Sequence, residues 1–231
     1  MCVAASMPLL AAAPSLALAQ GQEQGWETIS RGPIVVKVRT ISGTPQREVW
    51  AEGELEAEVQ DLQSAILDAD AYPRFMPYVK ETRVLETTRG GAQLVYARLE
   101  PPFIGARDYV VKVEIHKQAD GDGRGEFANA WHSVPDRVPR RQSVVRLPIC
   151  DGSWRVSRAA APGRSKVVYR ASVDPGGWVP GFISDMANKS GALGTMRAVE
   201  REAQRRAEAR KAQAANGLSQ RTSSPRRQGS P

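Results

Sequence analysis

The first part of the chain alternates hydrophobic and polar residues in the way that β-strands do. Residues 26–41, WETISRGPIVVKVRTI, are rich in β-branched residues, and after the turn SGTPQ the stretch REVWAEGELEAEV at 47–59 alternates again. A period of two places alternate side chains on opposite faces of a strand, and a short polar turn joins two such strands. The pattern therefore predicts a strand hairpin at the start of the domain.

The period then changes to that of a helix. Val59, Leu62, Ile66 and Leu67 recur at spacings that place them on one helical face. We expect Tyr72-Pro73 to end this helix, because the residue before a proline disfavours helical geometry. A short turn follows, so two small helices are predicted after the hairpin.

The middle of the chain returns to strands. ETRVLETTRGGAQLVYARLE predicts a hairpin that turns at Arg89-Gly90-Gly91, and RDYVVKVEIHK at 107–117 alternates cleanly. Four later stretches, GRGEFANAWHSV, RQSVVRLPI, DGSWRVSRAA and SKVVYRASVD, have the same character and are separated by turn residues such as Ala161-Pro162-Gly163. With the first hairpin they predict an antiparallel sheet of about eight or nine strands.

The end of the chain predicts one long helix from about 179 to about 214. Phe182, Met186, Leu193 and Met196 recur at helical spacing, whereas the stretch beyond Val199, EREAQRRAEARKAQ, is charged and has little to bury. The order of elements therefore predicts an α+β fold, with a curved antiparallel sheet, two small helices and a long C-terminal helix.

Length and composition agree with one domain over 26–209. The chain has 231 residues, 41% of them hydrophobic, which is enough for one sizeable core. The sequence contains no run of the roughly 18 consecutive apolar residues that a membrane-spanning helix needs. We therefore expect a soluble domain with additions at both ends.

The N-terminal additions are expected to be a signal peptide and a linker. Residues 1–19 are rich in Ala and Leu and end in Ala17-Leu18-Ala19, a small-x-small pattern that suits signal peptidase. Residues 20–25 would be the linker. The pattern predicts a periplasmic or secreted protein, but residues 1–19 lack the Lys or Arg of a basic n-region. A disordered Ala-rich leader on a cytoplasmic protein is the alternative.

The net charge of +7 is concentrated in the C-terminal tail. Residues 210–231 hold five Lys or Arg and no acidic residue, which leaves +2 for the rest of the chain. Residues 215–231 are polar and rich in Pro, Ser and Gly, a composition typical of disordered segments. We expect a solvated basic tail and no nucleic-acid partner.

The sequence has too few residues of the types that commonly bind metals to predict a metal or cofactor site. Removal of the leader would leave Cys150 as the single cysteine, which excludes an internal disulfide and a cysteine-based zinc site. Cys150 itself is expected to be a small apolar core residue. The sequence has no paired-carboxylate or Gly-rich phosphate motif. The alternating acidic run at 52–58 is most simply the solvated face of a strand.

Four segments, in their order and spacing, resemble a known family. They are AYPRFMPYVKETRVLE at 71–86, PPFIGARDYVVKV at 101–113, GSWRV at 152–156 and YRASVDPGGWVPGFISDMANKSG at 169–191. Together they are similar to the StAR-related lipid-transfer (START) branch of the helix-grip fold. The resemblance implies a sheet that grips the C-terminal helix, with a tunnel between them that holds one lipid or other hydrophobic molecule.

The resemblance also implies that the C-terminal helix roofs the tunnel and opens to admit the ligand. The candidate roof residues are Val179, Phe182, Ile183, Met186 and Leu193. Gly176, Gly177, Gly191 and Gly194 would lower the cost of tilting or unravelling this helix. The alternative is that the apolar residues are ordinary core and the glycines only allow close packing.

The loop EPPFIGAR is expected at the mouth of the tunnel. We hypothesise that Phe103 and Ile104 touch a membrane transiently or shield the mouth, and packing onto the helix is the alternative. Arg107 and Asp108, which begin the next strand, are interpreted as a structural ion pair that fixes the loop.

The predicted inner face of the tunnel lies on neighbouring strands. The candidates are Leu94, Tyr96 and Arg98 on one strand, Tyr109, Val111 and Val113 on the next, and Trp131. Some sterol-binding relatives place an acidic and a basic residue on the first two strands, where this chain has Leu94 and Val113. Arg98 or Tyr96 could supply a polar anchor instead, or Arg98 could point outward.

The same fold also hosts polyketide cyclases and aromatases, so catalysis is the alternative function. Such chemistry needs an acid or base in the pocket, and only His116 and His132 are available as histidines. We expect His116 to reach solvent and His132 to be an ordinary strand-end histidine. A His132 that faces the tunnel and acts as a base is the alternative. The preferred prediction is a monomeric lipid carrier that is not an enzyme and uses no cofactor.

Overall fold

The computed structural model describes residues 25–120, 125–177, 179 and 181–222. For residues 181–190 and 216–222 it describes the path of the backbone alone. The predicted signal peptide, nearly all of the predicted linker and the end of the predicted tail lie outside the described residues.

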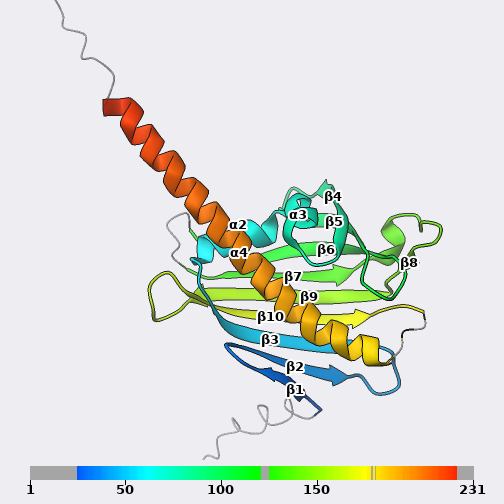
Figure 1. The fold of residues 1–231 in the computed structure, drawn as a ribbon. Coiled ribbons are helices and arrows are strands. Elements are labelled where there is room, and N and C mark those ends of the chain that lie inside the picture. The colour runs from blue at the N-terminus through cyan, green and yellow to red at the C-terminus, as the bar shows by residue number, and fades with distance from the viewer. Residues whose placement is uncertain (1–24, 121–124, 178, 180, 223–231) are drawn as a thin grey trace, which may run out of the picture.

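One large sheet dominates the fold (Figure 1). Its strands run in the order β1-β2-β3-β10-β9-β7-β6-β5-β4, with every neighbouring pair antiparallel, and the short β8 pairs in parallel with β6. The strands are β1 (Glu27–Arg31), β2 (Ile34–Thr40), β3 (Arg47–Leu55), β4 (Val79–Thr87), β5 (Gln93–Leu99), β6 (Arg107–Lys117), β7 (Phe127–Ser133), β8 (Val145–Arg146), β9 (Ile149–Arg158) and β10 (Ser165–Asp174).

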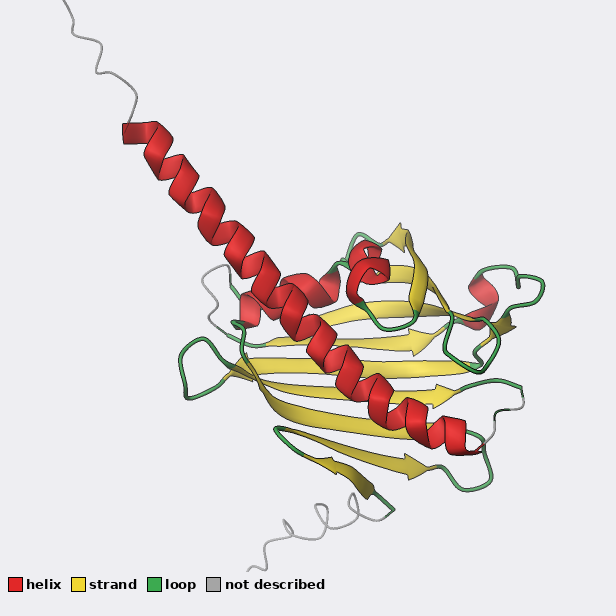
Figure 2. Cartoon of the chain, in the orientation of Figure 1, coloured by secondary structure: helices red, strands yellow, loops and turns green. Residues whose placement is uncertain are grey.

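The predicted antiparallel sheet is confirmed, and it has ten strands among the residues that the structure describes. The opening stretch makes two strands, because Gly32-Pro33 interrupts it between β1 and β2. The sheet curves around one face (Figure 2). Register shifts occur between β1 and β2, β4 and β5, and β6 and β7. Such bulges bend a strand and increase its twist, which favours this curvature.

The helices cover the concave face of the sheet (Figure 2). They are α2 (Val59–Leu67), the 3-10 turn η1 (Ala69–Ala71), α3 (Tyr72–Phe75) and α4 (Gly181–Thr222), whereas the 3-10 turn η2 (Pro135–Arg137) lies beside the outer face of β6. Pro73 lies in the first turn of α3 and so begins a helix instead of ending one, a position where its missing N–H costs nothing. None of the described helices combines the length and apolar character of a bilayer-spanning segment.

Helix α4 continues well beyond the domain (Figure 1). It extends to Thr222, so residues 215–222 are helical although their composition predicts disorder. On the domain, Ala192, Met196, Val199 and Ala203 of α4 pack in the core with the inner faces of β2, β3 and α2. The central part of α4 therefore belongs to the hydrophobic core.

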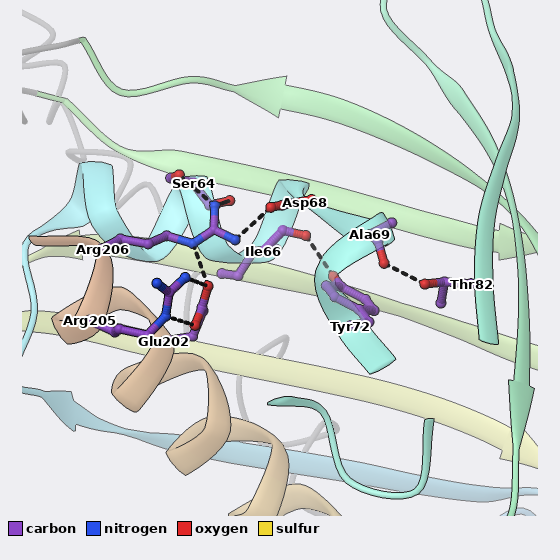
Figure 3. Close-up of polar contacts among 9 residues, drawn as sticks. All are labelled: Ser64, Ile66, Asp68, Ala69, Tyr72, Thr82, Glu202, Arg205 and Arg206. Carbon is purple, nitrogen blue, oxygen red and sulfur yellow. Dashed lines mark hydrogen bonds and ion pairs between the residues drawn. The ribbon is translucent and has the colours of Figure 1, made fainter. Parts of the chain in front are cut away.

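Charged residues attach the next turns of α4 to α2 (Figure 3). Arg206 forms an ion pair with Asp68 at 2.6 Å and donates to the carbonyl oxygen of Ser64 at 2.9 Å. Glu202, 6% exposed, accepts hydrogen bonds from both Arg205 and Arg206. These contacts hold the part of α4 that follows the core.

Two hydrogen bonds fix the segment that connects α2 to the sheet (Figure 3). Tyr72 Oη donates to the carbonyl oxygen of Ile66, and Thr82 Oγ1 of β4 donates to the carbonyl oxygen of Ala69, each at 2.6 Å. They hold α2, η1 and α3 as one wall beside α4.

Candidate ligand-binding cavity

A cavity of about 260 Å³ lies between the concave face of the sheet, the α2–α3 segment and α4. Its described lining consists of uncharged residues. They are Ile66, Leu67, Ala69, Tyr72, Met76, Pro77, Val79, Gln93, Val95, Leu99, Tyr109, Val111, Val113, Asn129, Trp131, Leu147, Cys150, Trp154, Tyr169, Val173 and Thr195. Such a lining excludes water and accepts apolar surface.

Three aromatic rings form the floor of the cavity. The ring of Tyr169 lies 6.1 Å from that of Trp131 in a stacked arrangement and 4.5 Å from that of Trp154 in a tilted one. Gly152 makes room for the indole of Trp131, since a Cβ at Gly152 would lie 2.2 Å from Cζ2 of that ring. The indole can therefore lie flat across β9 because β9 has a glycine there.

A few polar groups interrupt the apolar lining. Asn129 is 4% exposed, and its Oδ1 accepts a hydrogen bond from the backbone N–H of Trp154 at 3.2 Å. Burial raises the pKa of the Tyr109 and Tyr169 phenols, so both stay protonated at neutral pH. Burial and the charge of Asp151 raise the pKa of the Cys150 thiol to about 12. Cys150 therefore lines the cavity as a thiol, which is a poor nucleophile.

The structure brings four of the predicted tunnel residues together in this lining. Tyr109, Val111 and Val113 of β6 and Trp131 of β7 all face the cavity. On β5, however, the inner residues are Gln93, Val95 and Leu99, which are in register with the inner face of β6.

The expectation that Leu94, Tyr96 and Arg98 face inward is wrong, because they lie on the opposite face of β5. Arg98 forms an ion pair with Glu100 near the surface. Tyr96 is fully buried beneath Arg83 and Arg141, whose guanidinium carbons lie 5.1 and 4.9 Å from its ring centre. Both faces of β5 are covered, so hydrophobicity alone cannot tell its inner face from its outer one.

The predicted roof is described only in part. Val179 is half-buried outside the described lining, and Leu193 packs against the core, whereas Thr195 of α4 faces the cavity. The assignment of Leu193 to the lining is therefore wrong. The side chains of Phe182, Ile183 and Met186 lie outside the described residues.

The four glycines of the predicted gate have different surroundings. Gly176 and Gly177 adopt φ values of +63° and +62°, a region that favours glycine, and so form the turn into α4. A Cβ at Gly194 would lie 3.3 Å from Cγ of Pro77, so this glycine allows close approach of α4 to the cavity wall. A Cβ at Gly191 would meet none of the described residues within 4 Å. Close packing therefore accounts for Gly194 and does not account for Gly191.

Arg107 connects the loop EPPFIGAR, residues 100–107, to the turn into α4. Its guanidinium donates to the carbonyl oxygens of Gly105 and Pro175, the latter at 3.4 Å. Phe103 is 79% exposed in a left-handed backbone conformation, and Ile104 is half-buried. The described residues therefore leave Phe103 uncovered, which does not fit the alternative that it packs onto the helix.

The predicted pairing of Arg107 with Asp108 is wrong. Asp108 pairs instead with Arg146 of β8, with Nε and Oδ1 at 2.7 Å and both side chains 1% exposed. Successive residues of a strand point to opposite faces, so Arg107 and Asp108 cannot meet. Arg107 still fixes the loop, through the two carbonyl oxygens.

The histidines do not supply an acid or base to the cavity. His116 is exposed, and the His132 side chain is 64% exposed, with Nδ1 3.9 Å from Asp151. Trp131, the preceding residue of β7, takes the inner face. Within the described part of the chain, no cluster of three or more His, Cys, Asp or Glu could hold a metal ion.

Comparison with known proteins connects this cavity to a family. Residues 55–200 match the family described as polyketide cyclase / dehydrase and lipid transport. An uncharacterised protein of Pseudomonas aeruginosa is 20% identical over 174 residues, which cover 75% of this chain and 83% of that protein.

Solved structures show the same fold. A STAR-related lipid transfer protein fragment from Xanthomonas axonopodis is 28% identical, with a TM-score of 0.66, covering 78% of this chain and 99% of that one. Human STARD10 is 18% identical, with a TM-score of 0.68, covering 83% of this chain and 78% of that one. The Zhui aromatase/cyclase from Streptomyces is 14% identical, with a TM-score of 0.51, covering 70% of this chain and 96% of that one.

The helix-grip fold expected from the sequence is confirmed by these likenesses. The START-type fold and the family match suggest binding of a hydrophobic ligand, and the described lining of the cavity suits one. By its match over residues 55–200, this chain belongs to the polyketide cyclase / dehydrase and lipid transport family.

Proposed function

We propose that this protein is a carrier that encloses one lipid or other hydrophobic molecule and transfers it through water as a monomer. The observation that carries this proposal is the cavity of about 260 Å³ with its uncharged, largely apolar described lining. Apolar surface that leaves water for such a site gains roughly 25 cal/mol per Å². Binding therefore needs no covalent step.

The chemistry of the lining supports a carrier over a cyclase. Catalysis by proton transfer needs an acid or base whose pKa lies near the working pH. The raised pKa values of the Tyr109, Tyr169 and Cys150 side chains take these groups away from neutral pH. The cyclase neighbour, at 14% identity, shares the fold alone.

Exchange of the ligand is proposed to use the N-terminal part of α4 as a gate. The later turns of α4 are held by the core and by the Arg206 contacts with α2. The beginning of α4 follows the Gly176-Gly177 turn. Gly191 lies at the start of the attached part, and none of the described residues would contact a Cβ there. Opening before Gly191 would uncover the cavity while the core stays intact.

Phe103 is proposed to contact the membrane when the gate opens. It is 79% exposed, and Arg107 connects its loop to the turn into α4. An exposed aromatic side chain beside a cavity mouth fits an interface with lipid better than contact with water. Insertion of Phe103 could therefore be coupled to movement of the turn.

We further propose that the protein is exported, on the basis of the Ala17-Leu18-Ala19 pattern. Mass determination of the protein recovered from each cell fraction tests this proposal. Loss of residues 1–19 outside the cytoplasm supports it, and an uncleaved chain confined to the cytoplasm contradicts it.

Native mass spectrometry of the protein purified from its own compartment tests the carrier. We expect a one-to-one complex with a hydrophobic molecule, which denaturation releases unchanged. Incubation of the complex with phosphatidylcholine vesicles should then deplete the protein of that molecule. A protein that instead converts an added polyketide mimic into a cyclised product would support the cyclase alternative.

A further inference from the structure

The cavity contains hydrogen-bond donors that the protein itself does not use. Tyr109 of β6 and Tyr169 of β10 both line it, and neither phenol has a hydrogen-bond partner among the described residues. By contrast, Tyr72 Oη is already bonded to the carbonyl oxygen of Ile66. A donor that faces a cavity without a protein partner is available to a ligand, which can replace the water that it would otherwise bind.

Asn129 adds a third donor. Because its Oδ1 accepts the Trp154 N–H, the orientation of the amide is fixed and Nδ2 is the group left over. This Nδ2 has no partner within the part of the chain that the structure describes, although Asn129 is 4% exposed and lines the cavity.

The two phenols face the same space. Tyr109 and Tyr169 both belong to the lining of this one cavity, and burial, followed by the charges of Cys150 and Tyr72, raises the pKa of each phenol. The ring of Tyr169 stacks on that of Trp131, and this contact fixes its position in the floor of the cavity. Donors from β6, β7 and β10 thus line a single cavity.

The described lining has donors but no charge. An ionised group moved out of water needs a partner of opposite charge, and none of the described lining residues supplies one. A hydroxyl or carbonyl oxygen needs only the donors that are present. The volume of about 260 Å³ lies just below the roughly 300–1,000 Å³ of pockets for drug-sized ligands, which suits a small ring system or one chain.

We infer that the ligand is a small, uncharged hydrophobic molecule with a hydroxyl or carbonyl oxygen, and that Tyr109 and Tyr169 donate hydrogen bonds to that oxygen. This inference deepens the proposed function and rests on it. It excludes free fatty acids, amines and two-chain phospholipids as the preferred ligand.

Three probes with one ring skeleton test the inference: naphthalene, 2-naphthol and 2-naphthoate. Equilibrium dialysis at pH 7 against ligand-free protein gives each affinity. We expect 2-naphthol to bind about tenfold or more tightly than 2-naphthoate, because the carboxylate would be buried without a counter-charge. Equal or tighter binding of 2-naphthoate would overturn the inference.

Substitutions separate hydrogen bonding from hydrophobic fit. The double variant Tyr109→Phe/Tyr169→Phe should lose about three- to tenfold in affinity for 2-naphthol, as expected for lost hydrogen bonds, while its affinity for naphthalene changes less than about twofold. Tyr78→Phe is the matched control, because Tyr78 is 42% exposed and not among the described lining residues. Equal losses for both probes would contradict the role of the phenols.

The probes also distinguish this inference from the proposed function. If naphthalene and 2-naphthol bind equally well to both proteins, the cavity is a hydrophobic site and the role of the phenols is wrong. If no probe enters the folded protein, whose folding is checked by circular dichroism, the proposed function fails along with the inference.

Discussion

Asp108 and Arg146 form a buried ion pair, although 38 residues separate them in the sequence. Two hydrogen bonds of 2.7 and 3.1 Å join the carboxylate to the guanidinium. Arg146 also donates to the carbonyl oxygens of Val138 and Pro139, at 3.0 and 3.3 Å. This pair fastens the segment that leads into β8 against the outer face of β6.

Arg146→Met is expected to destabilise the protein by about 3–5 kcal/mol, because it leaves Asp108 buried without a partner. Chemical denaturation measures this loss. Arg140→Met is the matched control, since the side chains of Arg140 and Asp136 are 68% and 87% exposed, and it should cost less than about 0.5 kcal/mol. Equal losses for the two variants would contradict a stabilising role of the buried pair.

The attachment of α4 to α2 should weaken in acid. Hydrogen bonds from Arg205 and Arg206 lower the pKa of Glu202 to about 2. A carboxylate with a lowered pKa stabilises the folded state at neutral pH, and this contribution is lost as the pH falls from about 4.5 to about 2. We expect a loss on the order of 2 kcal/mol over that range.

Glu202→Gln isolates this contribution. The variant should be less stable than the natural protein at pH 7, and the difference should shrink towards pH 2.5 in denaturation experiments at both pH values. Glu208→Gln, at an exposed position of the same helix, is the control. A difference that stays constant with pH would show that the ionised form of Glu202 contributes nothing.

Substitution by alanine should stabilise the protein at Gly191 but not at Gly194. The new Cβ of Gly191→Ala meets none of the described residues, so the change should stabilise α4 by about 0.5–1 kcal/mol, since alanine is the better helix former. If opening before Gly191 is the gate, the same change slows ligand release. Gly194→Ala brings a Cβ to 3.3 Å from Pro77 and should give no gain in stability. Stopped-flow release of the neutral fluorophore prodan into vesicles measures the rate, and faster release from Gly191→Ala would count against the gate.

The sequence predicts those parts of the fold whose pattern is local and unambiguous. The alternation of Tyr109, Val111 and Val113 identifies the inner face of β6 correctly, because its outer neighbours include Lys112 and Glu114. On β5 the stretch LVYA is apolar on both faces, since the outer face is also covered, so the alternation does not choose between them.

Contacts between residues far apart in the sequence are the second limit on what the sequence can predict. Nothing near Asp108 in the sequence identifies Arg146, and the adjacent Arg107 is the more obvious partner until the strand geometry places it on the other face. The donors at Tyr169 and Asn129 were missed for a related reason. Their strands were predicted, but which residues meet in the cavity depends on the pairing of β7, β9 and β10.

A reversible cross-link between Pro77 and Gly194 tests the gate most directly. A Cβ at Gly194 would lie 3.9 Å from Cβ of Pro77, within the roughly 3.5–4.5 Å that a disulfide spans. Pro77→Cys/Gly194→Cys, made in a Cys2→Ala/Cys150→Ala background, would bind α4 to the cavity wall when oxidised. Release of prodan into phosphatidylcholine vesicles should then keep its rate to within about twofold on oxidation and reduction, because the proposed gate opens before Gly191 and the cross-link holds only the part of α4 that stays attached. The single variants control for the loss of Pro77 and of Gly194. Release that slows by about tenfold on oxidation and recovers on reduction would mean that α4 must part from Pro77, and the gate would have to extend beyond Gly194.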